Sequence, residues 1–277
     1  MFAADNPYLP QARLAVRVLR HVAEEAVFAL KGGTAINLFY RELPRLSVDL
    51  DLAYVPLAER KVSLRDTAAA LRQIAARVRS GLPAVRIDES QVSKGKLLAQ
   101  EGRARIKVEV NTVLRGCMHA PSRLRGFPAV SDLFGDVEAQ VLAFEDLFAG
   151  KLVAALDRQH PRDLFDVAPL LDAEGLSKSL LDAFVVYLAS HDRPMSEVLA
   201  PGEKDIRPAY ENEFAYMTSE PVSLSTLLDA RSRLVRELYR GLLPRHRTFL
   251  RSVKALEPDW SLVPVKHAAP RNRASRS

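Results

Sequence analysis

Two aspartates separated by a single residue are the side chains of this sequence best placed to do chemistry. In the run RLSVDLDL, Asp49 and Asp51 alternate with Val48, Leu50 and Leu52. Side chains of an extended strand point alternately to its two faces, so both carboxylates should share one face, with Cα atoms roughly 6.6 Å apart. Carboxylate oxygens suit Mg²⁺ and Mn²⁺. The pair therefore predicts a site for one or two divalent cations.

A pair of glycines precedes these acids. Gly32 and Gly33 follow the apolar run 27–30, and a short helix is expected at 35–40 with Thr34 as its cap. Strand, glycine turn and helix form a layout that cradles phosphate groups. Most Gly-Gly pairs are turns without a ligand. This pair is a better candidate for phosphate binding because Asp49 lies only 16 residues after Gly33.

A third carboxylate is predicted on another strand. In the run 103–111 the polar face carries Lys107, Glu109 and Asn111. Three acids on neighbouring strands are costly unless cations or hydrogen bonds compensate them. Ser47 should face the same side as Asp49 and hydrogen-bond at the turn. A sharper hypothesis is that phosphorylation of Ser47 would silence the site, because a dianion would compete for the metal.

A second cluster follows later, in GKLVAALDRQHPRDLFD. Lys151 and Arg158 are seven residues apart and should share one helix face. Pro161 should end that helix or begin the next, which carries Arg162, Asp163 and Asp166 in its first turns. At this spacing Arg162 and Asp166 would also make an ordinary surface ion pair. The pattern alone leaves both interpretations open.

The elements that must position these residues change character along the chain. The first half mixes strands and helices, and the second half is helical. Helices are expected at 11–29, 63–80, 141–156, 164–171, 176–189, 224–242 and 247–256, and strands at 85–92, 97–100 and 103–111. Capping-box spacing of Ser63 and Asp66 should start the second helix, whereas 115–135 and 193–219 should be irregular. We predict domains at 1–139 and 140–262 and a basic, disordered tail at 263–277.

Composition narrows the class of protein. With 48% hydrophobic and 27% charged residues, the 277-residue chain has enough apolar residues for a sizeable core. The net charge of +6, with 30 Arg among 40 cationic residues, favours a polyanionic partner. A single cysteine, Cys117, excludes an internal disulfide and fits a reducing compartment. No apolar run is long enough to span a membrane, and the start shows no signal peptide, so a cytoplasmic location is expected.

These motifs resemble a known family, the AbiEii/AbiGii-type nucleotidyltransferase toxins of type IV toxin–antitoxin systems, which include the mycobacterial MenT toxins. The resemblance rests on Lys31–Ala35 (KGGTA), Arg45–Asp51 (RLSVDLD), Lys151, Arg158 and Arg162–Asp166 (RDLFD). It covers about the first 170 residues. The wider relatives are polymerase β-type nucleotidyltransferases, which implies an α+β fold: a mixed sheet with flanking helices, followed by a helical C-terminal half that completes the active site.

The resemblance implies transfer of a nucleoside monophosphate from an NTP by a two-metal mechanism that uses Mg²⁺ or Mn²⁺. Several toxins of this type modify the 3′ acceptor end of tRNA and so block translation, and a cognate antitoxin is expected. The implied roles are metal binding for Asp49, Asp51 and Glu109, phosphate binding for Gly32, Gly33, Thr34 and Ser47, triphosphate binding for Lys151, Arg158 and Arg162, and orientation of Lys151 or an arginine for Asp166.

Two alternatives remain at this stage. One is a nucleotidyltransferase that acts on another RNA, a protein or a small molecule. The other is a catalytically silent nucleotide- or RNA-binding module with the same fold. The presence of all three acids argues against it, because a protein without catalytic activity usually loses acids that are costly to keep together. The sequence does not indicate which NTP or tRNA is used, nor the oligomeric state.

Overall fold

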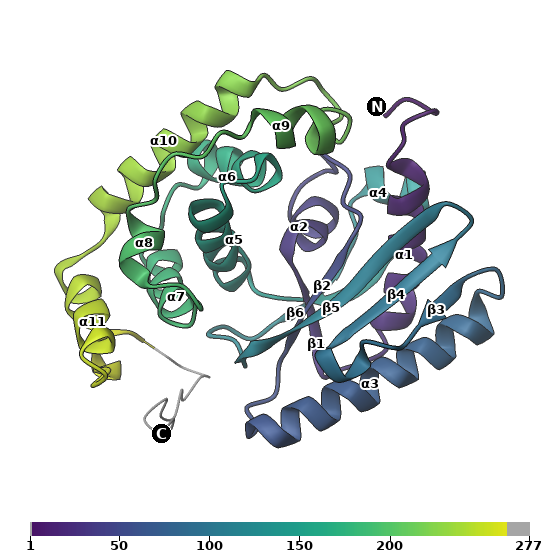
Figure 1. Cartoon of the computed structure of the whole chain (residues 1–277), viewed down its shortest axis with the longest axis horizontal. Coiled ribbons are helices and arrows are strands. Elements are labelled where there is room, and N and C mark those ends of the chain that lie inside the picture. Colours follow the sequence, from purple (N-terminus) through teal and green to yellow (C-terminus); the bar gives the residue numbers. More distant parts are fainter. Residues whose placement is uncertain (1, 265–277) are drawn as a thin grey trace. The chain divides into compact units, whose positions relative to one another are not determined.

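A mixed seven-stranded sheet forms the centre of the first half of the chain. The structure, a computed structural model, describes residues 2–264. The strands are β1 (Phe28–Lys31), β2 (Leu50–Tyr54), β3 (Arg86–Asp88), β4 (Lys96–Glu101), β5 (Ala104–Arg115), β6 (Ser122–Arg125) and β7 (Glu138–Val141), in the order β3-β4-β5-β2-β1-β7-β6 (Figure 1). Strand β2 is parallel to β5 and antiparallel to β1. The predicted α+β class is confirmed.

The described chain divides into two compact units. Of the described residues, unit 1 comprises 2–116, Pro121–Ala143 and Glu213–Pro221, and unit 2 comprises Cys117–Ala120, Phe144–Asn212 and 222–264. The chain therefore passes between the units several times. The predicted boundary at 139/140 lies close to Phe144, where the main span of unit 2 begins. Of the predicted tail, residues 265–277 lie outside the described residues.

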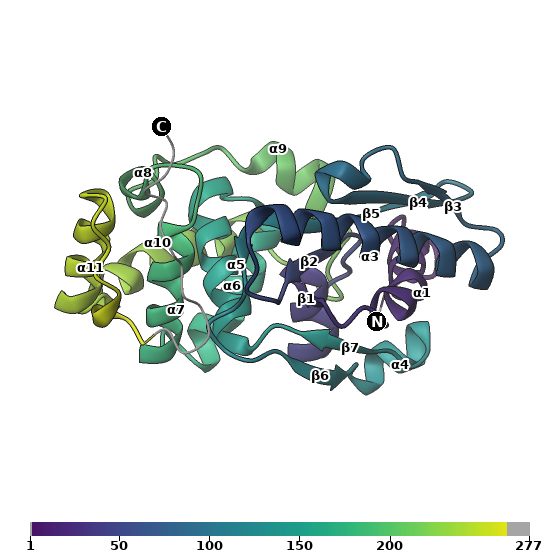
Figure 2. The same cartoon turned by 90° about the horizontal axis from the view of Figure 1, so that it is seen from below.

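In unit 1 the alternation of side chains separates a buried face of the sheet from a polar one. Leu50, Leu52, Val108 and Val110 are at most 3% exposed. Helices α1 (Leu9–Val22) and α3 (Arg60–Gly81) pack against β5 and against each other (Figure 2). At the intervening positions, Asp51 of β2 and Lys107, Glu109 and Asn111 of β5 are half-buried and face the other side of the sheet. The core therefore supports the strands that carry the acids.

Several local predictions in unit 1 are wrong in their boundaries. Helix α1 ends at Val22, seven residues earlier than expected. Helix α3 begins at Arg60, so Ser63 lies inside it and donates its hydroxyl to the Arg60 carbonyl instead of capping the helix. The expected irregular segment 115–135 contains β6 and helix α4 (Pro128–Phe134). An edge strand of sequence SRLR lacks the apolar alternation by which strands are recognised.

Unit 2 is helical, as expected. Its main helices are α5 (Phe144–Arg158), α6 (Pro161–Ala173), α7 (Lys178–Ala189), α10 (Leu224–Gly241) and α11 (Pro244–Lys254). Phe148 of α5 and Phe184 of α7 are fully buried where these helices pack together. None of the helices within residues 2–264 has both the length and the apolar character needed to cross a bilayer.

The segment 193–219 is more regular than predicted. It contains α8 (Met195–Leu199), α9 (Arg207–Ala209) and a π-helical turn, Tyr210–Phe214. Its last part belongs to unit 1, where the Leu46 amide donates to the Met217 carbonyl at 2.7 Å and Arg45 pairs with Thr218. Residues 213–221 therefore support the chain just before the acids.

Candidate active site

Charged residues of four neighbouring strands form one row across the polar face of unit 1. Lys31 of β1 lies opposite Asp51 of β2, Asp51 lies beside Glu109 of β5, and Lys96 of β4 lies opposite Glu109. Residues paired in this way present their side chains on the same face. We name Lys31, Asp51, Glu109 and Lys96 the charged row. It brings together two of the three predicted acids.

Both carboxylate oxygens of Glu109 contact a lysine. Lys96 Nζ lies 2.9 Å from Oε1, and Lys107 Nζ lies 2.6 Å from Oε2. Partial burial alone would raise the pKa of Glu109, but the hydrogen bonds from Lys107 and Lys96 outweigh it, and the pKa is lowered. Glu109 is therefore ionised and neutralised by its neighbours.

Asp49 lies directly before β2, which begins at Leu50, so only Asp51 is within the regular strand. The Lys107 amide approaches Asp49 Oδ1 at 3.4 Å. Partial burial would lower the pKa of Lys107, yet the contact with Glu109, followed by the charges of Asp49 and Asp51, raises it above its usual value. The three acids thus act on the same lysine.

The glycine turn lies against the same acids. Gly32 has φ +72°, and a Cβ there would be 2.6 Å from Asp51 Oδ2. At Gly33 a Cβ would meet the Arg45 guanidinium and would lie 3.2 Å from Ser47 Oγ. Gly32 requires glycine because of its positive φ and the close approach of Asp51, whereas a side chain at Gly33 would require the Arg45 guanidinium to move.

Thr34 joins the turn to the acid strand. Helix α2 (Gly32–Ala35) begins at Gly32 with Lys31 as N-cap, so the prediction that Thr34 caps a helix at 35–40 is wrong. Residues 36–40 form a π-helical turn instead. Thr34 Oγ1 lies 2.8 Å from Ser47 Oγ and 2.5 Å from the Asp49 carbonyl oxygen. The predicted hydrogen bond of Ser47 at the turn is present.

Sequence reasoning missed Arg45, which is only 2% exposed. Its Nη1 donates to the Leu46 carbonyl at 2.9 Å, and its guanidinium lies against Gly33. The guanidinium of a buried arginine therefore packs against the glycine turn. The sequence feature that could have identified Arg45 is its position four residues before Asp49, within the motif Arg45–Asp51.

The second cluster lies within unit 2. Lys151 Nζ of α5 lies 2.8 Å from Asp163 Oδ1 and 2.9 Å from Asp166 Oδ2, both on α6. These three side chains are 5%, 4% and 1% exposed. Arg158, whose side chain is 62% exposed, contacts Asp163 at 2.9 Å. The expected contact of Asp166 with Lys151 is present.

Asp163 was named in the motif but given no role, although it contacts both Lys151 and Arg158. Its signal was its place as the acid in the first turn of α6, which begins at Pro161. The Arg162 backbone amide donates to His160 Nδ1, the cap of that helix. The role of the Arg162 side chain stays a prediction.

The sequence and the fold of this chain are both similar to those of known proteins. A sequence profile of the nucleotidyl transferase AbiEii toxins, type IV toxin–antitoxin system, matches residues 13–267. The chain belongs to this family. Its fold resembles that of MenT4, a nucleotidyltransferase toxin from Mycobacterium tuberculosis H37Rv, with a TM-score of 0.63, 16% identity and coverage of 93% of this chain and 96% of that one. A search of curated proteins finds no significant match.

The acids of this AbiEii-family chain fit a divalent cation held jointly with a substrate. Within residues 2–264, no group of three His, Cys, Asp or Glu side chains could hold a metal ion by itself. Mg²⁺ is commonly held by one or two carboxylates together with substrate phosphates. Asp49 and Asp51 match that pattern, because they lie two residues apart at the start of β2 and Asp51 lies against the glycine turn.

A further buried acid, Asp146, has a structural role in unit 2. It is fully buried and accepts hydrogen bonds from the amides of Met118 and His119 and from the Tyr187 hydroxyl, at 2.7, 2.9 and 2.9 Å. His119 Nδ1 lies 2.7 Å from it, and His119 Nε2 lies 3.2 Å from Ser179 Oγ. Asp146 thus connects residues 117–120 with α5 and α7.

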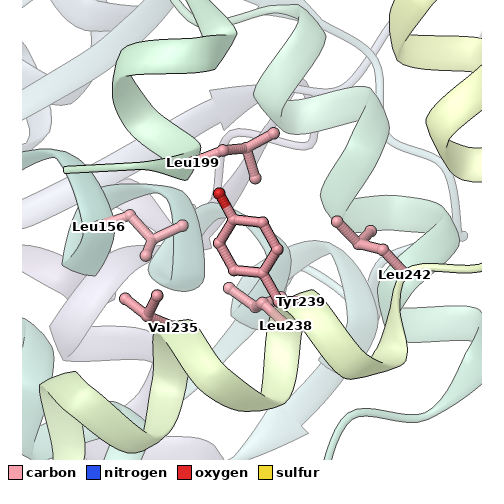
Figure 3. A pocket seen from close by; sticks show the side chains of 6 residues that line it. All are labelled: Leu156, Leu199, Val235, Leu238, Tyr239 and Leu242. Carbon is pink, nitrogen blue, oxygen red and sulfur yellow. The ribbon is translucent and has the colours of Figure 1, made fainter.

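Two cavities lie away from the charged row. One in unit 2 measures ≈ 10 Å³, space for about one water, and Figure 3 shows the Tyr239 ring among the aliphatic side chains that line it. The other, ≈ 240 Å³, is lined by Arg20 of α1 and by residues of and beside β6 and β7, including Arg123, Arg125 and Glu138. Neither is lined by Asp49, Asp51 or Glu109, so we base the site on the charged row.

Proposed function

We propose that this AbiEii-family protein transfers a nucleoside monophosphate from an NTP to the 3′ acceptor end of tRNA, with Mg²⁺ or Mn²⁺, and so blocks translation. The observation that carries the proposal is the approach of Gly32 to Asp51, which joins a phosphate-type turn to a pair of acids. The proposal implies a reaction in the cytoplasm, where NTPs and tRNA occur together, and a cognate antitoxin that restrains it.

In this proposal Asp49 and Asp51 hold the divalent cation, which supplies positive charge at the reacting phosphate when bound. The backbone amides of Gly32 and Gly33 donate to phosphate oxygens, because the glycines leave the turn open to close approach. The Thr34 and Ser47 hydroxyls, which contact each other, keep the turn and Asp49 together.

For the cluster of unit 2 we keep the prediction made from the sequence. Lys151 would supply positive charge to the triphosphate, Arg158 and Arg162 would assist, and Asp166 would orient Lys151. Two contacts support the last role: Asp163 and Asp166 both hold the ammonium group, which leaves it little rotational freedom.

The test is an incubation of purified protein with total tRNA and each labelled NTP in turn, with Mg²⁺, Mn²⁺ or EDTA. We expect one or more NTPs to label tRNA in the presence of metal. Asp49→Asn should abolish labelling while leaving the fold intact, because Asp49 is half-buried beside the polar face rather than in the core. Oxidation of the tRNA 3′ diol with periodate should also abolish it.

Three results would redirect the proposal. Label on periodate-treated tRNA would exclude the 3′ end as acceptor. Label on protein or on a small molecule instead of RNA would favour another acceptor for the same transferase. Absence of label with every NTP, acceptor and metal, in a protein that still binds nucleotide, would favour a silent binding module.

A further inference from the structure

We propose that Glu109 is a clamp for two lysines rather than a metal ligand, and that these lysines, Lys96 and Lys107, bind backbone phosphates of the nucleic-acid acceptor. The inference rests on the proposed function, since it concerns the second reactant of the same site. It assigns unit 1 a phosphate-binding element on the side of the acids opposite the glycine turn.

The contacts of Glu109 carry the first step. Each of its oxygens lies within 2.9 Å of a different ammonium group, one from β4 and one from β5. A metal ion at Glu109 would have to displace one or both lysines from a partly buried carboxylate. Asp49 and Asp51 remain as the pair that can share a cation, so Glu109 is not needed as a ligand.

The order of the strands carries the second step. Along the charged row the sequence of strands is β4, β5, β2, β1, and the glycine turn follows β1 directly. Asp51 therefore lies between the turn and the lysine pair. A transfer reaction brings its two substrates to the metal-binding acids together. With the triphosphate at the glycine turn, the lysine side is left for the acceptor.

The exposure of the two lysines carries the third step. Their side chains are 39% and 37% exposed, so an incoming ligand can reach part of each lysine beside the acids. Each ammonium has three donors, and one contact with Glu109 leaves others for a phosphate oxygen.

The first experiment measures RNA binding by the full chain with labelled tRNA and fluorescence anisotropy at several salt concentrations. The variant is Lys96→Met/Lys107→Met, which keeps the aliphatic stems. The matched control is Lys61→Met, an exposed lysine of α3, the helix on the buried face of the sheet. Melting curves verify that both variants fold.

We expect the double variant to bind tRNA more weakly and its plot of log affinity against log salt to become shallower by about 1.4 to 2, since each phosphate contact contributes about 0.7 to 1. Binding of a non-hydrolysable NTP analogue should change less than about twofold. An unchanged salt slope, or no measurable tRNA binding by the wild type, would overturn the inference. Weaker binding of the analogue alone would assign the lysines to the triphosphate instead and overturn it equally.

The second experiment separates clamp from ligand by Mn²⁺ binding, measured by electron paramagnetic resonance without nucleotide or RNA. Glu109→Gln should bind Mn²⁺ within about threefold of the wild type, whereas Asp49→Asn should lose binding. Loss of Mn²⁺ binding in Glu109→Gln to the extent seen in Asp49→Asn would make Glu109 a ligand and refute the clamp.

The inference and the proposed function fail in different ways. If the wild type labels tRNA while the double variant keeps its tRNA affinity and salt slope, the inference is wrong and the function stands. If the wild type labels no RNA while the double variant loses tRNA affinity and slope, the lysines bind phosphate and the proposed reaction is wrong.

Discussion

Substitution of Lys151 by alanine should destabilise unit 2, and this loss of stability must be measured before any loss of activity is interpreted. In the wild type the Lys151 ammonium is held by Asp163 and Asp166, and all three side chains are at most 5% exposed. Lys151→Ala removes this cation and leaves two carboxylates in a site from which water is largely excluded. Arg158 still contacts Asp163, but Asp166 loses the cation at 2.9 Å.

Breaking a buried ion pair by removing one partner destabilises a protein by about 3–5 kcal/mol, because the remaining charge is left uncompensated. The free energy of unfolding of natural proteins is about 5–15 kcal/mol, so this loss is a large share of the total stability. At about 2–4 °C per kcal/mol for a chain of this size, the midpoint of thermal unfolding should fall by about 6–20 °C.

The assay is urea and thermal unfolding followed by circular dichroism. Lys178→Ala is the matched control, since Lys178 is an exposed lysine at the start of α7, and its free energy of unfolding should stay within about 0.5 kcal/mol of the wild type. A change below about 1 kcal/mol in Lys151→Ala would refute the view that this lysine compensates two buried acids. Transfer by the variant should be measured at a temperature at which it is folded, so that loss of activity reports on the site.

Three further outcomes follow from single contacts. Gly32→Ala should lower the transfer rate at least tenfold in a single-turnover assay, because the new methyl group would lie 2.6 Å from Asp51 Oδ2 at φ +72°; a wild-type rate would contradict the close approach. Asp146→Ala should lower the free energy of unfolding by about 3 kcal/mol or more, since three donors, one of them in a buried bond and two in part-buried bonds, lose their acceptor; urea midpoints measure it, and an unchanged midpoint would exclude the anchoring role. Burial raises the pKa of Cys117 to about 11, so at pH 8 the folded protein should react with iodoacetamide about 100-fold more slowly than an ordinary thiol, and rapid labelling would argue against a buried thiol.

Periodicity predicted the halves of the fold well and their details poorly. The apolar alternation of β5 located its buried face, and the spacing in unit 2 located its main helices, because both patterns follow from local geometry. Strand β6 was missed since its polar sequence carries no alternation. Thr34 was misassigned as a cap because a threonine beside glycines looks alike whether its hydroxyl serves its own helix or, as here, contacts Ser47 and the Asp49 carbonyl.

The site was predicted as a set of residues rather than as a set of contacts. The alternation of side chains along β5 placed Glu109 on the polar face. Which residues lie beside it depends on the register between strands, which the sequence of one strand does not determine. The same limit applies to Lys151 and Asp166. Each was placed on a helix, but their contact depends on the packing of α5 and α6 across the break before Pro161.

The charged row explains how this fold keeps acids side by side. Asp51 and Glu109 are adjacent, and two carboxylates so placed repel each other. On the outer side of each acid the register places a lysine: Lys31 beside Asp51 and Lys96 beside Glu109. The register therefore sets a lysine on the strand that flanks each acid, and at Glu109 this lysine makes an ion pair, with Lys96 Nζ 2.9 Å from Oε1. It follows that a search for sites of this kind should look, beside the paired acids, for lysines on the strands that flank them.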